Sequence, residues 1–258
     1  MISDIGATCI DSITHAHDAT HVIAADDGTS LRRTPKLMIC VCRTSNILHM
    51  SWLVKSAEKG RPLPCNGHLL LNDTKAESTY NFSMKETLKN GIEVRTNQGG
   101  LLDGWKVFFC KGVAGHKAPS MQELRLIIDA AGGTVLDTLT TKEAGAIASD
   151  RSVLIVTSDP PTAAQKSQAD KLMEKLGTSG RVETTSWLFQ CIIRQKIDTA
   201  VQDGSDKGGK LSLKHTKPTL TSGSKRKLSS SNLDANEEAP PSKRRVTGFL
   251  ELLVMCNH

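Results

Sequence analysis

The sequence is poor in aromatic residues and has no long hydrophobic run. Phe, Trp and Tyr make up 3% of the 258 residues. No apolar stretch reaches the ~18 residues that a membrane-spanning helix requires, so we expect no membrane partner. The start lacks the basic and apolar segments of a signal peptide. None of the seven cysteines has C-x-x-C spacing, and His15, His17 and His21 form no clear ligand pattern, so we predict a reducing compartment and no metal site.

Most of the chain also lacks a clear excess of positive or negative charge. Residues 202–258 carry 10 Lys/Arg and 6 Asp/Glu, whereas residues 1–201 carry 23 and 21. The nearly neutral larger part argues against a broad basic face, so direct nucleic-acid binding should be weak or absent. The glycine motifs of nucleotide sites and the G-x-S-x-G motif are missing, and we expect neither a cofactor nor an enzyme. A small nucleotide-using α/β enzyme remains the least favoured alternative.

The sequence contains an internal repeat. The segment 6–14, Gly-Ala-Thr-Cys-Ile-Asp-Ser-Ile-Thr, matches the segment 132–140, Gly-Gly-Thr-Val-Leu-Asp-Thr-Leu-Thr. Farther along, Ser-Trp-Leu at 51–53 matches Ser-Trp-Leu at 186–188. Ordered matches at similar offsets predict two copies of roughly 100 residues each.

The second copy can be assigned element by element. Its apolar patterns, helix caps and glycines predict the order β-α-β-β-α-β-α, with Ser120 and Ser186 as helix caps. Helical crossovers favour a mainly parallel sheet covered on both faces. In the first copy, five residues precede Gly6, whereas in the second copy 31 residues, 101–131, precede Gly132. We therefore expect the first copy to lack its first strand and most of its first helix.

The duplicated residues resemble the tandem BRCT family, in particular DNA-damage mediator and PAX-interacting proteins. The resemblance rests on Gly6-Ala7, Gly132-Gly133, Ala19-Thr20-His21-Val22-Ile23, Trp52, Trp187 and Gly60-Arg61-Pro62-Leu63-Pro64. It implies an α/β fold of two BRCT repeats, each with a small parallel four-stranded sheet flanked by helices, the first being incomplete. The expected divisions are repeat 1 at 1–72, a linker with a helix at 73–100, repeat 2 at 101–201 and a disordered basic tail at 202–258. We expect both tryptophans to be core residues.

The segment Arg32-Arg33-Thr34-Pro35-Lys36 is the main candidate for a binding site. Thr34 suits an N-cap and Pro35 a first helical position, which places basic residues at the positive end of a helix. That pattern fits either an anion site or a solvated turn.

The family resemblance assigns roles to these residues. It implies that Lys36 holds a phosphate, Arg33 grips the peptide near its +3 residue, and Met38 and Phe189 line the +3 pocket. Ordinary core positions are the alternative for Met38 and Phe189. The family's other phosphate ligands come from the first strand of repeat 1, which we expect to be missing. The resemblance therefore implies a pocket that lacks part of its phosphate ligands.

The tail carries two basic clusters separated by 15 residues, Lys225-Arg226-Lys227 and Lys243-Arg244-Arg245. They resemble a bipartite nuclear import signal, and a merely solvated basic tail is the alternative. The apolar stretch 246–256 is too short to span a membrane and suits a short docking helix.

The sequence therefore predicts a monomeric nuclear adaptor that recognises a phosphorylated Ser/Thr protein, such as a chromatin or repair factor. The alternative within the family is a BRCT scaffold that binds its partners independently of phosphate.

Overall fold

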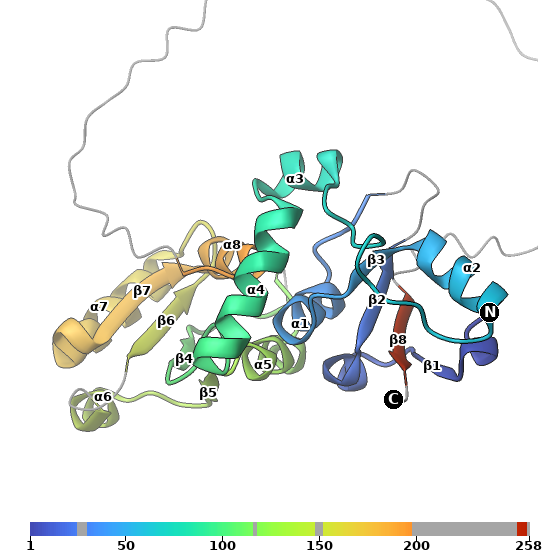
Figure 1. Ribbon diagram of the computed structural model, residues 1–258. Helices are drawn as coiled ribbons and strands as arrows, with labels where there is room; N and C mark the ends of the chain where they lie inside the picture. Colours follow the sequence, from blue (N-terminus) through green and yellow to red (C-terminus); the bar gives the residue numbers. More distant parts are fainter. Residues whose placement is uncertain (25–29, 116–117, 148–151, 198–251, 257–258) are drawn as a thin grey trace, which may run out of the picture. The chain divides into compact units, whose positions relative to one another are not determined.

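The computed structural model describes residues 1–24, 30–115, 118–147, 152–197 and 252–256 (Figure 1). The first repeat contains η1 (Ser3–Ile5), β1 (Ala7–Ile10), η2 (Ile13–Asp18), β2 (His21–Ala24), α1 (Pro35–Arg43), β3 (Ile47–His49) and α2 (Met50–Lys59). The linker forms α3 (Thr74–Tyr80) and α4 (Met84–Gln98). The second repeat contains β4 (Lys106–Phe109), α5 (Met121–Ala130), β5 (Thr134–Leu136), α6 (Thr141–Ile147), β6 (Val153–Thr157), α7 (Ala163–Leu176), η3 (Gly177–Ser179), β7 (Gly180–Thr184) and α8 (Thr185–Arg194). A last strand, β8, spans Leu252–Cys256.

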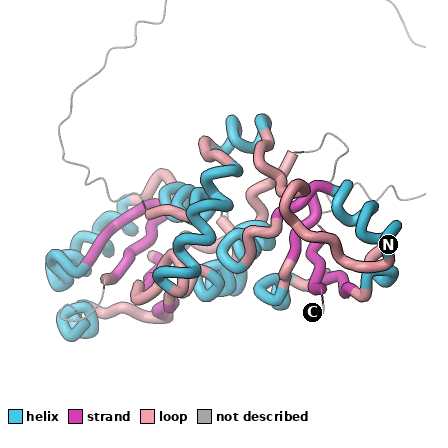
Figure 2. Tube along the Cα trace, viewed as in Figure 1, coloured by secondary structure: helices cyan, strands magenta, loops and turns pink. Residues whose placement is uncertain are grey.

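The second sheet has the predicted parallel topology. Its strand order is β5-β4-β6-β7, and every neighbouring pair is parallel. Along the chain, a helix connects each strand of this sheet to the next (Figure 2). Strand β6 is buried at all five positions, as a central strand covered on both faces should be. The predicted α/β fold class is confirmed, with α6 as an additional helix. The parallel sheet expected for the first repeat is wrong, because β8 pairs antiparallel with β1 and β2.

Local capping signals place most helix starts correctly. Ser120 begins α5 with a full capping box, in which its side chain accepts from Glu123 and the Glu123 side chain accepts in return. Ser83 begins the linker helix α4 in the predicted place. The cap of α8 differs from the prediction, because Thr184 rather than Ser186 accepts the N–H of Trp187. Thr184 ends β7 with an extended backbone, which is the conformation that an N-cap needs.

The first sheet contains a strand that the sequence analysis missed. Its order is β1-β8-β2-β3, so the C-terminal strand lies between two strands of the first repeat (Figure 1). The short docking helix expected at 246–256 is wrong, and the expected tail contains a strand. A continuous apolar run of this length does not by its periodicity distinguish a buried strand from a helix. The remainder of the predicted tail lies outside the described residues.

A continuous hydrophobic core joins the two repeats. Helix α1 contacts α4, α5 and α8, and its residues from Leu37 to Cys42 are all buried. Trp52 belongs to a second cluster with Ile5, Ile23, Leu48 and Leu53, and it is fully buried. The expected core position of Trp187 is met only in part, because this side chain packs against the core but is half-buried and lies against Arg181. In the part of the chain described above, no helix has the length and apolarity needed to cross a bilayer.

Candidate functional site

The candidate site begins at the N-terminus of α1. The Thr34 hydroxyl accepts a hydrogen bond from the backbone N–H of Leu37 at 3.1 Å, and Pro35 occupies the first turn. The predicted helix start is therefore confirmed. Proline suits this place because its missing N–H would have no partner within the helix. The cap fixes the direction in which the chain enters α1, and so it fixes the basic residues on either side.

Lys36 lies in the first turn of α1 and reaches toward the first sheet. Its Nζ atom donates to the carbonyl oxygen of Ile10 at 3.3 Å, and the side chain is half-buried. Ile10 is the last residue of β1. The ammonium is thus held at the edge of the sheet beside the positive end of the α1 dipole, where an anion would be favoured.

Arg33 connects three parts of the chain. Its guanidinium lies 5.2 Å from the ring centre of Tyr80 in the linker and 5.6 Å from that of Phe189 in α8. Burial lowers the pKa of Arg33, and Tyr80 opposes this shift. An arginine nevertheless stays protonated in proteins. Arg33 therefore brings a permanent cation to the boundary between the repeats, with two aromatic rings beside it.

A groove of about 330 Å³ opens beside Arg33 and Phe189. Hydroxyl groups, one carboxylate and a few apolar side chains form the rest of its wall. The other lining residues are Gly112, Val113, Ala118, Ser158, Asp159, Pro160, Thr162, Thr185 and Ser186. A cation, hydroxyl donors and an aromatic surface in one groove can bind the polar backbone and one apolar side chain of an extended peptide.

The structure brings together some of the residues that the sequence singled out. Arg33 and Phe189 share the groove wall although they are far apart in sequence. Thr34 and Lys36 lie at the adjacent start of α1. Met38 is 1% exposed and belongs to the core, so its side chain faces away from the groove. Phe189 is 7% exposed and belongs to both the core and the groove.

Asp73 is a positioning residue that the sequence analysis missed. Its carboxylate accepts from the Ser30 hydroxyl at 2.7 Å and from the Leu31 N–H at 2.8 Å, just before Arg33. It also caps α3 by accepting the N–H of Ala76. Burial raises the pKa of Asp73, but these hydrogen bonds outweigh burial and lower the pKa overall. An Asp before a helical segment signals a cap, but nothing local reveals the contact with residues 30 and 31.

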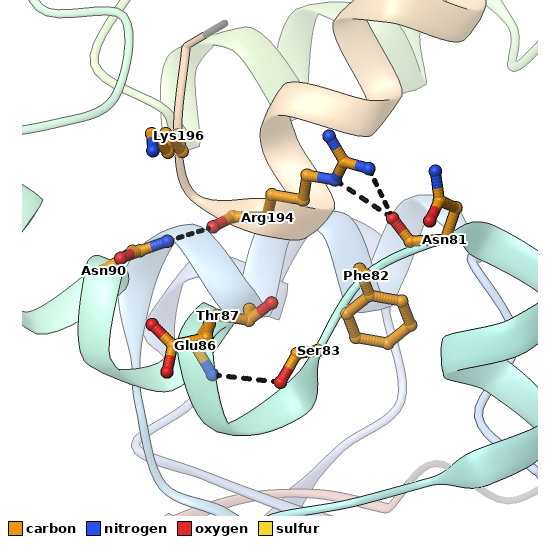
Figure 3. Close-up of a pocket in the computed structure, with 8 residues that line it drawn as sticks. All are labelled: Asn81, Phe82, Ser83, Glu86, Thr87, Asn90, Arg194 and Lys196. Carbon is orange, nitrogen blue, oxygen red and sulfur yellow. Dashed lines mark hydrogen bonds between the residues drawn. The ribbon is translucent and has the colours of Figure 1, made fainter.

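A second hollow marks the joint between the linker and α8 (Figure 3). The carbonyl oxygen of Asn81 accepts three hydrogen bonds, one from Gln190 at 2.8 Å and two from the Arg194 guanidinium at 3.0 and 2.6 Å. Asn81 has a φ of 50°, a left-handed conformation that asparagine tolerates well. This turn between α3 and α4 directs its carbonyl toward α8.

Side chains of α4 complete the joint by binding the last carbonyls of α8. The Thr87 hydroxyl donates to the carbonyl of Ile193 at 2.7 Å, and the Asn90 amide donates to that of Arg194 at 2.9 Å. The last carbonyls of a helix lack partners within the helix, so these contacts satisfy groups that would otherwise be unpaired. The hollow is therefore a structural joint, and the groove at Arg33 is the better candidate for ligand binding.

Thr87→Val is expected to lower the free energy of unfolding by about 1–3 kcal/mol, because it leaves the Ile193 carbonyl without its buried donor. Thr96→Val is the matched control on the same helix, where the side chain is exposed, and its change should be below about 0.5 kcal/mol. Urea unfolding of the full chain measures both. Equal stability of the two variants would show that this joint contributes little.

No group of three or more His, Cys, Asp or Glu side chains suited to a metal ion occurs among the residues described. Burial raises the pKa of the Cys42 and Cys110 thiols to about 11 in both cases. These two thiols are therefore protonated near neutral pH and unsuited to nucleophilic chemistry.

Comparison with known proteins agrees with this architecture. The family model described as BRCT domain matches residues 100–202. Among solved structures, the BRCT5-BRCT6 domains of S. pombe Brc1 are similar, with a TM-score of 0.53 and 18% sequence identity. That match covers 71% of this chain and 82% of the Brc1 chain. No curated protein matches the sequence significantly.

Proposed function

Residues 100–202 are a BRCT domain in a chain with the fold of a tandem BRCT pair, and from this premise we propose an adaptor that binds a phosphorylated Ser or Thr segment of a partner protein. BRCT domains are protein-interaction modules, which supports a protein as the partner. The observation that carries the proposal is the placement of Arg33 and Lys36. They flank the cap of α1, and Arg33 lines the groove between the repeats.

The start of α1 supports binding of the phosphate. The Lys36 ammonium and the positive end of the helix dipole would both attract a dianion there. The bond from Lys36 to the Ile10 carbonyl is a single contact of 3.3 Å, and an ammonium carries three protons. Lys36 can therefore retain this contact and still donate to a phosphate.

The groove at Arg33 supports recognition of the residues that follow the phosphorylated one. Arg33 would donate to the peptide backbone, and Phe189 would contact one apolar side chain. Arg33 and Lys36 lie on either side of the α1 cap, and in this proposal one extended peptide contacts both. In this proposal phosphate supplies affinity and the groove supplies selectivity.

A phosphate-independent scaffold is the second candidate, and one observation favours it. The Lys36 ammonium donates to the Ile10 carbonyl in the structure, so this side chain has a structural role that requires no phosphate. A scaffold would bind through the groove alone and would not distinguish a phosphorylated peptide from its unmodified counterpart.

Lys36→Ala tests the phosphate site. A charge-assisted hydrogen bond of roughly 1.5–3 kcal/mol would be lost, which is a ~10–100-fold loss of affinity. The probe is a peptide selected from a degenerate phosphoserine library, measured by calorimetry beside the same peptide without phosphate. Lys55→Ala, an exposed lysine of α2, is the matched control and should leave affinity unchanged. Unaltered affinity of Lys36→Ala would remove the phosphate site and leave the scaffold.

We further propose that the partner is a chromatin or repair factor in the nucleus, and that the tail directs import. The two basic clusters at 225–227 and 243–245 lie outside the described residues. Deleting residues 222–246 removes both, and the tagged protein should then distribute between nucleus and cytoplasm in fluorescence images. Substituting the acidic residues Glu237 and Glu238 with glutamine is the control and should leave import unchanged. Full nuclear retention of the deletion variant would show that the signal lies elsewhere.

A further inference from the structure

The first sheet accepts a strand from outside the first repeat. Strand β8 pairs with β1 over Ala7↔Cys256 to Ile10↔Leu253, and with β2 over His21↔Val254 to Ile23↔Leu252. Both pairings are antiparallel. We propose that the gap between β1 and β2 is a strand-accepting site, and that the chain's own segment Leu252–Cys256 is its resident occupant, bound within the same molecule.

Comparison of the two sheets supports this assignment. In the second sheet the position between the two corresponding strands belongs to β4, which is parallel to β5 and β6. β8 has the same position in the first sheet but the opposite direction. A strand that enters through a helical crossover within its own repeat runs parallel to its neighbours. The reversed direction therefore distinguishes β8 as a strand added from a distant part of the chain.

The neighbours of the gap determine the chemistry of its occupant. All four residues of β2 are buried; Ile23 packs in the cluster of Trp52, whereas Val22 belongs to the larger core. A strand beside β2 must therefore be apolar on both faces. The sequence of β8, Leu-Leu-Val-Met-Cys, is apolar at every position. An empty gap would also leave the backbone groups of β2 without partners along one edge.

The tether explains why the occupant comes from the same molecule. The segment 199–248, rich in Gly, Ser and Lys, connects the second repeat to the C-terminal stretch. Tethering confers an effective concentration that approaches the millimolar range for short linkers and falls roughly as the −3/2 power of linker length. A short strand of weak affinity would therefore remain bound in its own molecule at micromolar protein concentrations.

A disulfide tests both the register and the origin of the strand. Residue 254 lies opposite Cys9, and directly opposed residues of antiparallel strands share a face at a Cα separation that suits a disulfide. In a Cys256→Ser background, Val254→Cys should form a disulfide with Cys9 when the full chain is oxidised with glutathione disulfide. Leu253→Cys in the same background is the matched control, because residue 253 opposes Ile10 on the other face.

Each outcome of the disulfide experiment either supports or overturns the proposal. A bond between Cys9 and residue 254 within monomers, found by peptide mapping and absent from the control, supports the proposal. Disulfide-linked dimers would show that a second copy supplies the strand and would overturn the tethered occupant. Equal linkage in variant and control, or no linkage, would overturn the site itself.

A second variant tests whether the gap accepts a separate strand. Val254→Pro in the full chain removes a backbone donor from the middle of β8, and proline is not tolerated in a central strand. Amide hydrogen exchange should become faster at the residues of β1 and β2 whose N–H groups face β8, while residues 106–109 of the second sheet stay protected. The N–H groups of Ala7 and Val22 should also stay protected, because they bond to the carbonyls of Ile2 and Asn46. Adding a synthetic peptide of residues 249–258 should restore the protection, and a scrambled peptide should not. Unchanged exchange in the variant, or no rescue by the peptide, would overturn the proposal.

Discussion

Trp52→Ala is expected to lower the free energy of unfolding by about 3–5 kcal/mol. The indole is fully buried among Ile5, Ile23, Leu48 and Leu53, so its removal leaves a large cavity. Its Nε1 atom donates to the Leu63 carbonyl at 2.9 Å, and its ring stacks on His21 with centroids 4.9 Å apart. Alanine would remove the packing, the hydrogen bond and the stacking together.

The equivalent tryptophan of the second repeat provides the comparison. Trp187 is half-buried and lies 4.4 Å from the Arg181 guanidinium, so Trp187→Ala should cost only about 1–2 kcal/mol. Urea unfolding of the full chain, followed by far-UV circular dichroism, measures both variants. Equal losses would mean that the burial of Trp52 contributes less than its packing indicates.

These two tryptophans show where sequence reasoning succeeds and where it stops. The repeated Ser-Trp-Leu pattern correctly locates the last helix of each repeat, because helix position depends on local pattern. It does not distinguish a buried from a half-buried ring. Trp52 is covered by the segment that follows α2 and returns Leu63 to its indole nitrogen. The burial of the ring therefore depends on the path of the chain after the helix. The three residues Ser-Trp-Leu do not determine that path.

In the candidate site, too, the local sequence predicts some features and misses others. The cap and first turn of α1 follow from Thr34 and Pro35, so the placement of Lys36 in the first turn was predictable from local sequence. The meeting of Arg33 with Phe189 joins residues of different repeats, and family resemblance rather than local pattern suggested it. The hydrogen bonds to the Asn81 carbonyl and the insertion of β8 were missed, because both depend on contacts between distant segments.

Phe189→Ala is expected to lower the free energy of unfolding by about 3–5 kcal/mol, with a value near the lower end. The side chain is 7% exposed and packs in the core that joins the repeats, but one edge lines the groove. Water can enter from the groove and the site can partly collapse, which reduces the cost of the cavity. Phe189→Leu retains most of the volume and should cost less than about 1.5 kcal/mol. Urea unfolding measures both variants.

A double-mutant cycle separates packing of the Phe189 ring from its interaction with Arg33. The guanidinium lies 5.6 Å from the ring centre, so the two side chains should couple by about 0.5–2 kcal/mol. Phe189→Leu and Arg33→Gln, measured singly and together, give this coupling directly. Additive losses would mean that the ring acts on Arg33 only as an apolar wall. Measurable coupling would mean that the ring holds the cation at the mouth of the groove, and Phe189→Leu should then also weaken phosphopeptide binding while stability is nearly preserved.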